Sequence, residues 1–135
     1  VTWADSIEAL AAASDIFSIN CPHNAATHHI VNAALIERMK PTAAIINTAR
    51  GEIIDEEALI AALQSGRIAG AGLDVYHNEP HVDPRFFALP NVVLLPHMGS
   101  ATYEGRDAMG EKVITNIRAW VDGHRPPDMV IIGWD

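Results

Sequence analysis

Residues 43–75 read AAIINTARGEIIDEEALIAALQSGRIAGAGLDV, and this stretch decides the fold. It contains two apolar runs, Ala43–Ile46 and Ala69–Val75, separated by a segment with helical periodicity. Asp55 predicts the start of a helix, because its carboxylate can accept a hydrogen bond from a free backbone N–H group, and Gly66 predicts the end of that helix. A strand, a helix and a second strand in succession indicate a βαβ unit with parallel strands.

Two further apolar runs extend this pattern toward both ends of the chain. Ile16–Ile19 comes first, and the segment after it predicts a helix over Ala33–Met39 that begins at the capping residue Asn32 and ends before Pro41. Val92–Leu95 is the fourth run. All four runs are continuously apolar, which is typical of parallel strands covered on both faces. The sequence therefore predicts an α/β fold with a four-stranded parallel sheet and crossover helices.

Helices are also predicted near both ends of the chain. Ser6–Ala13 is a short alanine-rich helix ahead of the first strand. Thr102–Val121 is a longer helix, ended by Gly123, with an apolar stripe at Met109, Val113, Ile117, Trp120 and Val121. The spacing of this stripe predicts packing against a sizeable partner. A last apolar stretch, Met129–Ile132, lies in the tail.

The composition limits the classes of protein to which the chain can belong. With 135 residues, of which 49% are hydrophobic and 19% charged, the chain is long enough for one domain with a packed core. Nine Lys and Arg against seventeen Asp and Glu give a net charge of −8, which argues against nucleic-acid binding. No apolar run approaches membrane-spanning length. The single cysteine, Cys21, cannot form an internal disulfide, so we expect a reducing compartment, the cytoplasm.

Polar residues follow each predicted strand at the point where the strand ends. The segments Asn20–Pro22, Asn47–Gly51 and Asp74–Tyr76 follow the first three runs, and Pro96–Ser100 follows the fourth. Glu79 comes shortly after the third of these segments. Ligands bind outside the carboxyl ends of the strands in an open parallel sheet, so we expect an Arg, an Asp, a Glu and a His to lie at one edge. This placement predicts a catalytic site.

Three of these side chains have complementary chemistry. His97 suits general acid–base catalysis, because imidazole titrates near neutral pH. Glu79 is the candidate carboxylate that would hold His97 in one tautomer and stabilise its protonated form. Arg50 presents a planar fork of donors suited to a substrate carboxylate, a contact worth roughly 1.5–3 kcal/mol. Interconversion of a 2-oxo acid and a 2-hydroxy acid requires such an acid–base His and such an Arg, with the hydride supplied by a cofactor.

Each of these residues also has a purely structural interpretation. Arg50 could pair with Glu52 or Asp55 in its own loop, as a surface arginine does. His97 could be a surface or capping residue, and Glu79 an ordinary turn residue before a proline. Any one of these interpretations is plausible alone. It is less plausible that all the structural interpretations are correct at once, at successive strand ends. This favours the catalytic interpretation.

A metal site is an alternative that the sequence disfavours. Its ligands would be the acidic and imidazole side chains of His77, Glu79, His81 and Asp83. Pro80 prevents the helix that would bring the two histidines onto one face, and Pro84 adds a second break. We therefore predict no metal site.

Three other features receive structural interpretations. His28 and His29 are adjacent, so on a helix or strand they would point apart, and we predict that they are loop or surface residues. Cys21 is interpreted as a packed residue at a strand end, since no activating partner can be named for its thiol. The segment Gly70–Gly72 is superficially like a dinucleotide loop, but it lies inside a predicted strand, where its glycines would allow close backbone approach.

The segments at the strand ends resemble the D-isomer-specific 2-hydroxyacid dehydrogenases, in that family's order and spacing. The resemblance is carried by Asp15–Pro22, Thr27, Met39–Pro41, Asn47–Gly51, Asp55–Leu59, Gly72–Val75, Glu79–Pro80 and Leu95–Thr102. It implies a Rossmann-like half-domain over residues 1–100, the C-terminal half of a nicotinamide-dinucleotide-binding domain. Residues 101–135 would then form the crossover helix and tail that return to a substrate domain absent from this chain. The family's glycine-rich phosphate loop is absent too, so we expect this chain alone to be inactive.

The resemblance also implies roles for individual residues. Arg50, Glu79 and His97 match the family's catalytic positions, with Arg50 and His97 touching the substrate. The positions implied to lie along the cofactor are Pro22, Thr48, Ala49, Arg50, Asp74, His97 and Gly99. Asp74 is implied to lie near the nicotinamide end.

The activity that the resemblance implies is hydride transfer from NAD(P)H to a small 2-oxo acid of the glyoxylate or hydroxypyruvate type, giving a D-2-hydroxy acid. The cofactor would be NAD or NADP, and the protein would be a homodimer. Two alternatives stay open. One is an enzyme like phosphoglycerate dehydrogenase. The other is a non-catalytic, NAD(H)-sensing module like the C-terminal binding protein corepressors.

Overall fold

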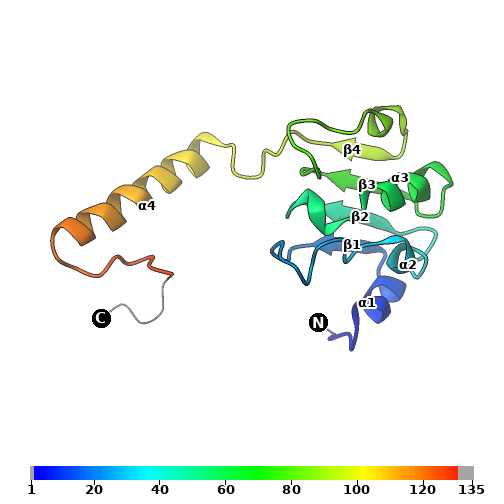
Figure 1. Cartoon of the computed structure of the whole chain (residues 1–135), viewed down its shortest axis with the longest axis horizontal. Helices are drawn as coiled ribbons and strands as arrows, with labels where there is room; N and C mark the ends of the chain where they lie inside the picture. Colours follow the sequence, from blue (N-terminus) through cyan, green and yellow to red (C-terminus); the bar gives the residue numbers. More distant parts are fainter. Residues whose placement is uncertain (1, 131–135) are drawn as a thin grey trace. The chain divides into compact units, whose positions relative to one another are not determined.

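The computed structural model of this chain describes residues 2–130 and divides it into two compact units, Val1–His97 and Met98–Asp135. The first unit contains a parallel sheet with the strand order β1-β2-β3-β4 (Figure 1). Its strands are β1 (Ile16–Ile19), β2 (Ala44–Asn47), β3 (Gly70–Leu73) and β4 (Val92–Leu94). All four predicted strands are confirmed: β1 has the same ends as its apolar run, and the ends of the other three differ from theirs by at most two residues.

The register of the sheet brings the carboxyl ends of the strands to one edge. Ile19 pairs with Asn47, and Asn47 in turn pairs with Leu73. Leu73 pairs with Leu94 at the last residue of β4. The segments that follow these four residues are those with the polar side chains that the sequence analysis singled out, so they leave the sheet at the same edge.

The helices of the first unit begin where the capping residues predict. α1 (Ile7–Ala13) starts after Ser6, α2 (Ala33–Ile36) after Asn32, and α3 (Glu56–Gln64) after Asp55. Each cap side chain accepts a hydrogen bond from a backbone N–H group in the first helical turn. Gly66, at a φ of 69°, lies just past the end of α3, as predicted. Two 3₁₀ helices, η1 (Gly51–Ile53) and η2 (Pro84–Ala88), complete the unit.

One predicted crossover helix is longer than the helix observed. The helix predicted over Ala33–Met39 ends at Ile36, and the residues after it form turns. A carbonyl just past this end, that of Glu37, accepts a hydrogen bond from the guanidinium of Arg67, which comes thirty residues later. The crossing from β3 to β4, where the sequence shows no helical periodicity, contains the short 3₁₀ helix η2.

One face of the sheet is buried and the other is not. Alternate strand residues enter the core, which they share with side chains of α2 and α3; the strand members are Phe17, Ile19, Ile45, Ala71 and Leu73. On the opposite face Ile16 is 67% exposed and Val93 is 64% exposed. Within the described residues of the first unit, the prediction that both faces are covered is therefore wrong, because its helices pack on one side only.

The second unit contains the long helix α4 (Tyr103–Val121), with Thr102 as its N-cap and Gly123 at a φ of 75° past its end. None of its residues is buried, so no described part of this unit covers the apolar stripe. Asp128 accepts hydrogen bonds from Lys112 and Asn116, which ties the following tail to the helix. In the predicted apolar stretch Met129–Ile132, Met129 and Val130 form no strand, and Ile131 and Ile132 lie outside the described residues. In residues 2–130 we find no helix of the length and apolar character needed to cross a membrane.

Candidate active site

The segment after β2 is shaped by a buried asparagine. Asn47 is 1% exposed, and its side-chain amide donates a hydrogen bond to the Arg50 carbonyl at 2.9 Å. Its side-chain oxygen accepts a hydrogen bond from the Ala49 N–H group at 3.0 Å. Because one side chain satisfies both backbone groups, Thr48, Ala49 and Arg50 are held in a tight turn at the end of the strand. The sequence analysis placed Asn47 in the polar segment after the second strand but gave its side chain no role.

Gly51 brings this turn against the segment after β3. A Cβ atom at Gly51 would lie 1.9 Å from the carbonyl carbon of Tyr76 and 2.3 Å from the nitrogen of His77. Only glycine allows the two backbones to approach so closely. Arg50 is thereby held beside the loop that carries Glu79, and its positive charge is one of the influences on the Glu79 carboxyl.

His97 and Glu79 form the pair that the sequence predicts. The His97 Nδ1 atom lies 2.6 Å from the Glu79 Oε2 atom. The other carboxylate oxygen, Oε1, accepts a hydrogen bond from the Tyr76 N–H group at 2.9 Å. His97 follows β4 with a φ of 52°, a conformation that non-glycine residues seldom adopt. Both side chains are partly open to solvent, so the pair lies at the surface of this unit.

The surroundings of Glu79 favour its ionised form. Partial burial by itself raises the pKa of this carboxyl. The hydrogen bonds from His97 and from the Tyr76 N–H group, with the positive charges of His97 and Arg50, outweigh burial and hold the pKa of Glu79 below its ordinary value. A carboxylate has no proton to donate, so the Nδ1 atom of His97 is the donor of the 2.6 Å hydrogen bond. The Nε2 atom of the same ring is left for chemistry with a ligand.

Within residues 2–130, Arg50 forms no ion pair with a carboxylate. Its guanidinium donates to the neighbouring Ala49 carbonyl, and the side chain is exposed. Among the ion pairs of the described residues, none joins Arg50 to Glu52 or Asp55, so the structural interpretation of Arg50 is not supported. Asp55 instead accepts a hydrogen bond from the Ala58 N–H group as the cap of α3.

The segments after β1 and β2 line one cavity of about 630 Å³. Its lining includes Pro22, Thr48, Ala49 and Arg50, four of the positions predicted to contact the cofactor. The loop that contains Pro22 is closed by Thr27, whose hydroxyl donates to the Pro22 carbonyl at 2.8 Å. The cavity is therefore built from two strand ends.

A second, more apolar cavity of about 500 Å³ lies on the exposed face of the sheet. Thr48 lines this cavity as well, together with Asp74, which is 4% exposed, and the backbone of β3. Gly70 and Gly72 keep this strand close to its neighbours, since a Cβ atom on Gly70 would lie 2.7 Å from the Asn91 carbonyl oxygen. The prediction of close backbone approach is confirmed at Gly70, whereas a Cβ atom on Gly72 would meet only the end of the Ile46 side chain, at 3.0 Å.

The predicted site residues thus fall into three groups. Pro22, Thr48, Ala49 and Arg50 share a cavity, Thr48 and Asp74 share another, and Glu79 and His97 form a hydrogen bond. Gly99 belongs to the second unit, so its place along a cofactor stays a prediction.

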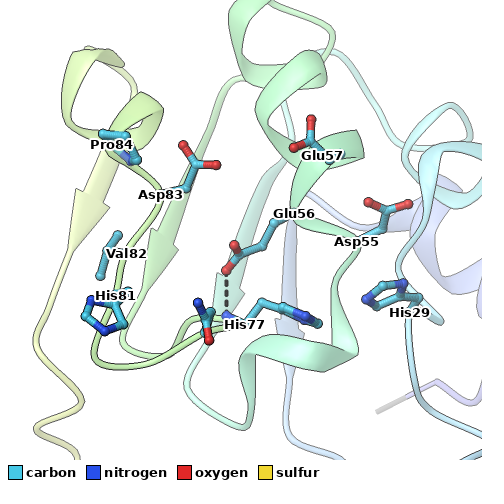
Figure 2. Close-up of a pocket in the computed structure, with 10 residues that line it drawn as sticks. His29, Asp55, Glu56, Glu57, His77, His81, Val82, Asp83 and Pro84 are labelled. Carbon is cyan, nitrogen blue, oxygen red and sulfur yellow. Dashed lines mark hydrogen bonds between the residues drawn. The ribbon is translucent and has the colours of Figure 1, made fainter.

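The residues of the disfavoured metal site are distributed differently. His77, His81 and Asp83 line a third pocket, of about 440 Å³ (Figure 2). The carboxylate of Glu79 instead binds His97. Across the 2–130 range, no group of three or more His, Cys, Asp or Glu residues is arranged to hold a metal ion. In the same pocket, burial raises the pKa of the Glu56 carboxyl, although that carboxylate accepts a 2.7 Å hydrogen bond from the His77 N–H group.

His28 and His29 lie in a loop, so the prediction that they are loop or surface residues is confirmed. Their rings stack with centroids 4.0 Å apart and an angle of 17° between the ring planes. The φ of 50° at His29 is neither helix nor strand geometry, in which the two side chains would point apart. Desolvation, and then the positive charge of His29 and of other nearby histidines, lower the pKa of His28.

Comparison with known proteins gives a consistent result. The family model described as D-isomer specific 2-hydroxyacid dehydrogenase, NAD binding domain, matches residues 1–99. A glyoxylate reductase of Thermococcus litoralis is 46% identical over 123 residues, which are 91% of this chain and 37% of that protein. A 4-methyl-2-oxopentanoate reductase A of Aspergillus oryzae is 47% identical over 117 residues, covering 87% of this chain and 36% of that protein.

Solved structures give the same result. An NADPH-dependent glyoxylate/hydroxypyruvate reductase of Sinorhizobium meliloti, in complex with NADP and malonate, matches with a TM-score of 0.86 and 42% identity. The match covers 89% of this chain and 38% of that one. The holo form of a D-mandelate dehydrogenase of Rhodotorula graminis matches with a TM-score of 0.88 and 38% identity, covering 95% of this chain and 38% of that one. This chain therefore spans well under half the length of the relatives that it matches.

Proposed function

The chain belongs to the D-isomer specific 2-hydroxyacid dehydrogenases, whose NAD-binding domain matches residues 1–99. We propose that it is the nicotinamide-binding part of an enzyme that reduces a small 2-oxo acid to the D-2-hydroxy acid. The substrate class is that of glyoxylate and hydroxypyruvate. The observation that carries the proposal is the 2.6 Å hydrogen bond between His97 and an ionised Glu79. Beside this pair lies Arg50, which forms no ion pair with any carboxylate of the described residues. The activities named for the relatives support the same substrate class.

The residues that line the two cavities fit a nicotinamide cofactor. Such a cofactor has polar amide and phosphate groups beside an apolar ring, and Thr48 lines both a polar and an apolar cavity. Pro22, Thr48, Ala49 and Asp74, together with Gly99, would hold the cofactor, NAD or NADP. When bound in its reduced form, the cofactor supplies the hydride that the carbonyl carbon receives.

In the proposed mechanism, the chain's own residues bind the acid and move one proton. The guanidinium of Arg50 binds the substrate carboxylate through two parallel hydrogen bonds. The Nε2 atom of His97 donates a proton to the carbonyl oxygen as that oxygen becomes an alcohol. Glu79 holds the ring through Nδ1 and stabilises its positive charge before the transfer. In the reverse reaction, the neutral ring accepts the hydroxyl proton.

The two parts of the chain have different proposed roles. Residues 1–100 would be the C-terminal half of the dinucleotide-binding domain, which the family match over residues 1–99 supports. Residues 101–135 would form the helix and tail that lead back to a substrate domain. We also propose that the protein that contains this chain is a cytoplasmic homodimer. The lone cysteine supports a reducing compartment, and light scattering of the purified protein tests the dimer.

Turnover of the reduced cofactor tests the proposal. The protein that contains this chain is offered NADH and NADPH with glyoxylate, hydroxypyruvate, pyruvate and 3-phosphohydroxypyruvate in turn. Rapid oxidation with glyoxylate or hydroxypyruvate is the expected result, and the preferred coenzyme follows from the same assay. A preference for the phosphorylated acid would instead indicate an enzyme like phosphoglycerate dehydrogenase. Tight cofactor binding without oxidation would contradict the proposal and indicate an NAD(H)-sensing module.

A further inference from the structure

Tyr76 is a buried residue between the two loops that carry the proposed acid–base pair. It is the last residue of the segment Asp74–Tyr76 that follows β3, and it is 5% exposed. Its hydroxyl lies 2.8 Å from the Leu95 carbonyl oxygen and 3.2 Å from the Leu73 carbonyl oxygen. The hydroxyl has one proton, and the shorter distance makes the Leu95 carbonyl its main acceptor. Burial raises the pKa of Tyr76, so the phenol keeps this proton.

The backbone of the same residue binds the other partner of the pair. The Tyr76 N–H group donates to Glu79 Oε1, and Glu79 Oε2 binds His97. Tyr76 therefore holds the carboxylate through its backbone and the end of β4 through its side chain. A phenylalanine would fill the same space and pack in the same way on Phe86, whose ring centroid lies 6.4 Å away. Only the hydroxyl reaches the Leu95 carbonyl.

The chain between Leu95 and His97 has little freedom of its own. It consists of Pro96, whose ring fixes φ, so the position of the Leu95 carbonyl largely determines where His97 begins. His97 itself has a φ of 52°, which a histidine keeps only when its surroundings impose it. Three described contacts flank this residue: the hydrogen bonds from the Tyr76 hydroxyl to the Leu95 carbonyl and from the Leu95 N–H group to the Leu73 carbonyl on one side, and the bond to Glu79 on the other.

We propose that the hydroxyl of Tyr76 is a positioning group, which keeps the His97 ring aligned with the Glu79 carboxylate by anchoring the Leu95 carbonyl. The group does not touch the substrate, and its effect passes through His97. It therefore affects the proton-transfer step and leaves the binding of the 2-oxo acid at Arg50 unchanged. The consequence for catalysis rests on the proposed function, whereas the alignment of the pair can be measured on this chain alone.

The first test measures alignment by proton NMR. In the 135-residue chain, the proton on His97 Nδ1 should give a resonance far downfield that is absent from the His97→Gln variant. Tyr76→Phe should make this proton exchange with water about threefold to tenfold faster, the effect of losing one neutral hydrogen bond. Tyr103→Phe is the matched control, because it removes the same atom from a side chain that is 88% exposed. Equal exchange rates in the two phenylalanine variants would overturn the proposal.

A second measurement covers the case in which Tyr76→Phe does not fold. In the Tyr103→Phe background, Tyr76 is the only tyrosine of the chain, so 3-fluorotyrosine fed to the cells replaces it alone. The fluorinated phenol is more acidic and donates a stronger hydrogen bond to Leu95. We expect slower exchange of the His97 proton than in the unlabelled chain. An unchanged rate would overturn the proposal.

The third test uses turnover by the protein that contains this chain. Tyr76→Phe should lower kcat about threefold to tenfold and leave the KM for the 2-oxo acid unchanged. A purely structural role would lower stability and leave both kcat and the His97 proton as in the control, which would contradict the proposal. If the wild-type protein oxidises no reduced cofactor, the proposed function fails, and the NMR experiments on this chain still decide the role of Tyr76.

Discussion

The two parts of the proposed catalytic site differ in how far the chain itself satisfies their hydrogen bonds. In the Glu79–His97 pair, both carboxylate oxygens are engaged, one by His97 and one by the Tyr76 N–H group. Arg50, on the neighbouring loop, bonds the carbonyl beside it and turns the rest of its fork to solvent. One part is therefore preorganised before any ligand binds, and the other is left open for a ligand.

This difference matches the work that each part is proposed to do. An acid–base group is most effective when its orientation costs nothing at the moment of reaction, which a preformed hydrogen bond provides. A guanidinium binds a ligand carboxylate most tightly when the hydrogen bonds that it loses on binding are only those to water. The predictions that follow change one part and not the other, except for the first, which breaks both.

The largest effect is expected from Gly51→Ala, because this glycine keeps the two loops together. A Cβ atom there would lie 1.9 Å from the Tyr76 carbonyl carbon, so backbone must move. We expect a loss of more than about 3 kcal/mol in the free energy of unfolding, measured by urea denaturation, and loss of turnover. The control is Gly110→Ala in α4, where an added Cβ atom meets nothing within 4 Å. This substitution should stabilise the helix by about 1 kcal/mol. Similar destabilisation of both variants would argue against the close contact.

The next largest effect is expected from His97→Ala. Removing the proposed proton donor should lower kcat about 100-fold to 10,000-fold, with little change in the KM for the 2-oxo acid. Steady-state kinetics measures this directly. His81→Ala is the control, since His81 is exposed and lines the pocket of Figure 2. Wild-type kcat in the His97 variant would remove the residue from the mechanism.

A smaller effect is expected from Arg50→Ala, and it should appear in binding. Loss of a charge-assisted contact should raise the KM for the 2-oxo acid about 10-fold to 150-fold. Arg50→Lys should recover part of this loss, because an ammonium keeps the charge without the planar fork. Arg38→Ala, at an exposed arginine after α2, is the control. An unchanged KM in Arg50→Ala would mean that the carboxylate binds elsewhere.

The smallest effect concerns pH and the Glu79 carboxyl. Its pKa in the folded chain lies below the ordinary value of 4.5, so its ionised form stabilises the fold. This contribution is complete above pH 4.5 and is lost as the pH falls through the folded-state pKa. Urea denaturation at a series of pH values should show a shallower acid loss of stability for Glu79→Gln than for wild type. Parallel curves would show that the pair adds nothing to stability.

Much of the fold could be predicted because its signals are local. Apolar runs, cap residues such as Asp55 and Asn32, and Gly66 each report on the few residues beside them, and each was located correctly. The contact between Glu79 and His97, eighteen residues apart, followed from a single topological rule about the edge of a parallel sheet.

What the sequence did not reveal depends on contacts with backbone groups far along the chain. The Tyr76 hydroxyl binds the carbonyl of Leu95, and any residue type could have supplied that acceptor. Near the early end of α2, the guanidinium of Arg67 likewise donates a hydrogen bond to the carbonyl of Glu37, thirty residues earlier in the chain. The sheet residues Ile16 and Val93 are apolar yet exposed within the first unit, because periodicity predicts which face is apolar and not what covers it.

The central claim is that Arg50 binds the acid while His97 moves the proton, and a single-turnover experiment tests it most directly. The protein that contains this chain is loaded with its reduced coenzyme and mixed with saturating 2-oxo acid, and loss of nicotinamide absorbance is followed by stopped flow. We predict that saturation restores Arg50→Ala to within about tenfold of the wild-type rate, whereas His97→Ala stays at least about 100-fold slower. Equal rates in the two variants, or a wild-type rate in His97→Ala, would contradict the account.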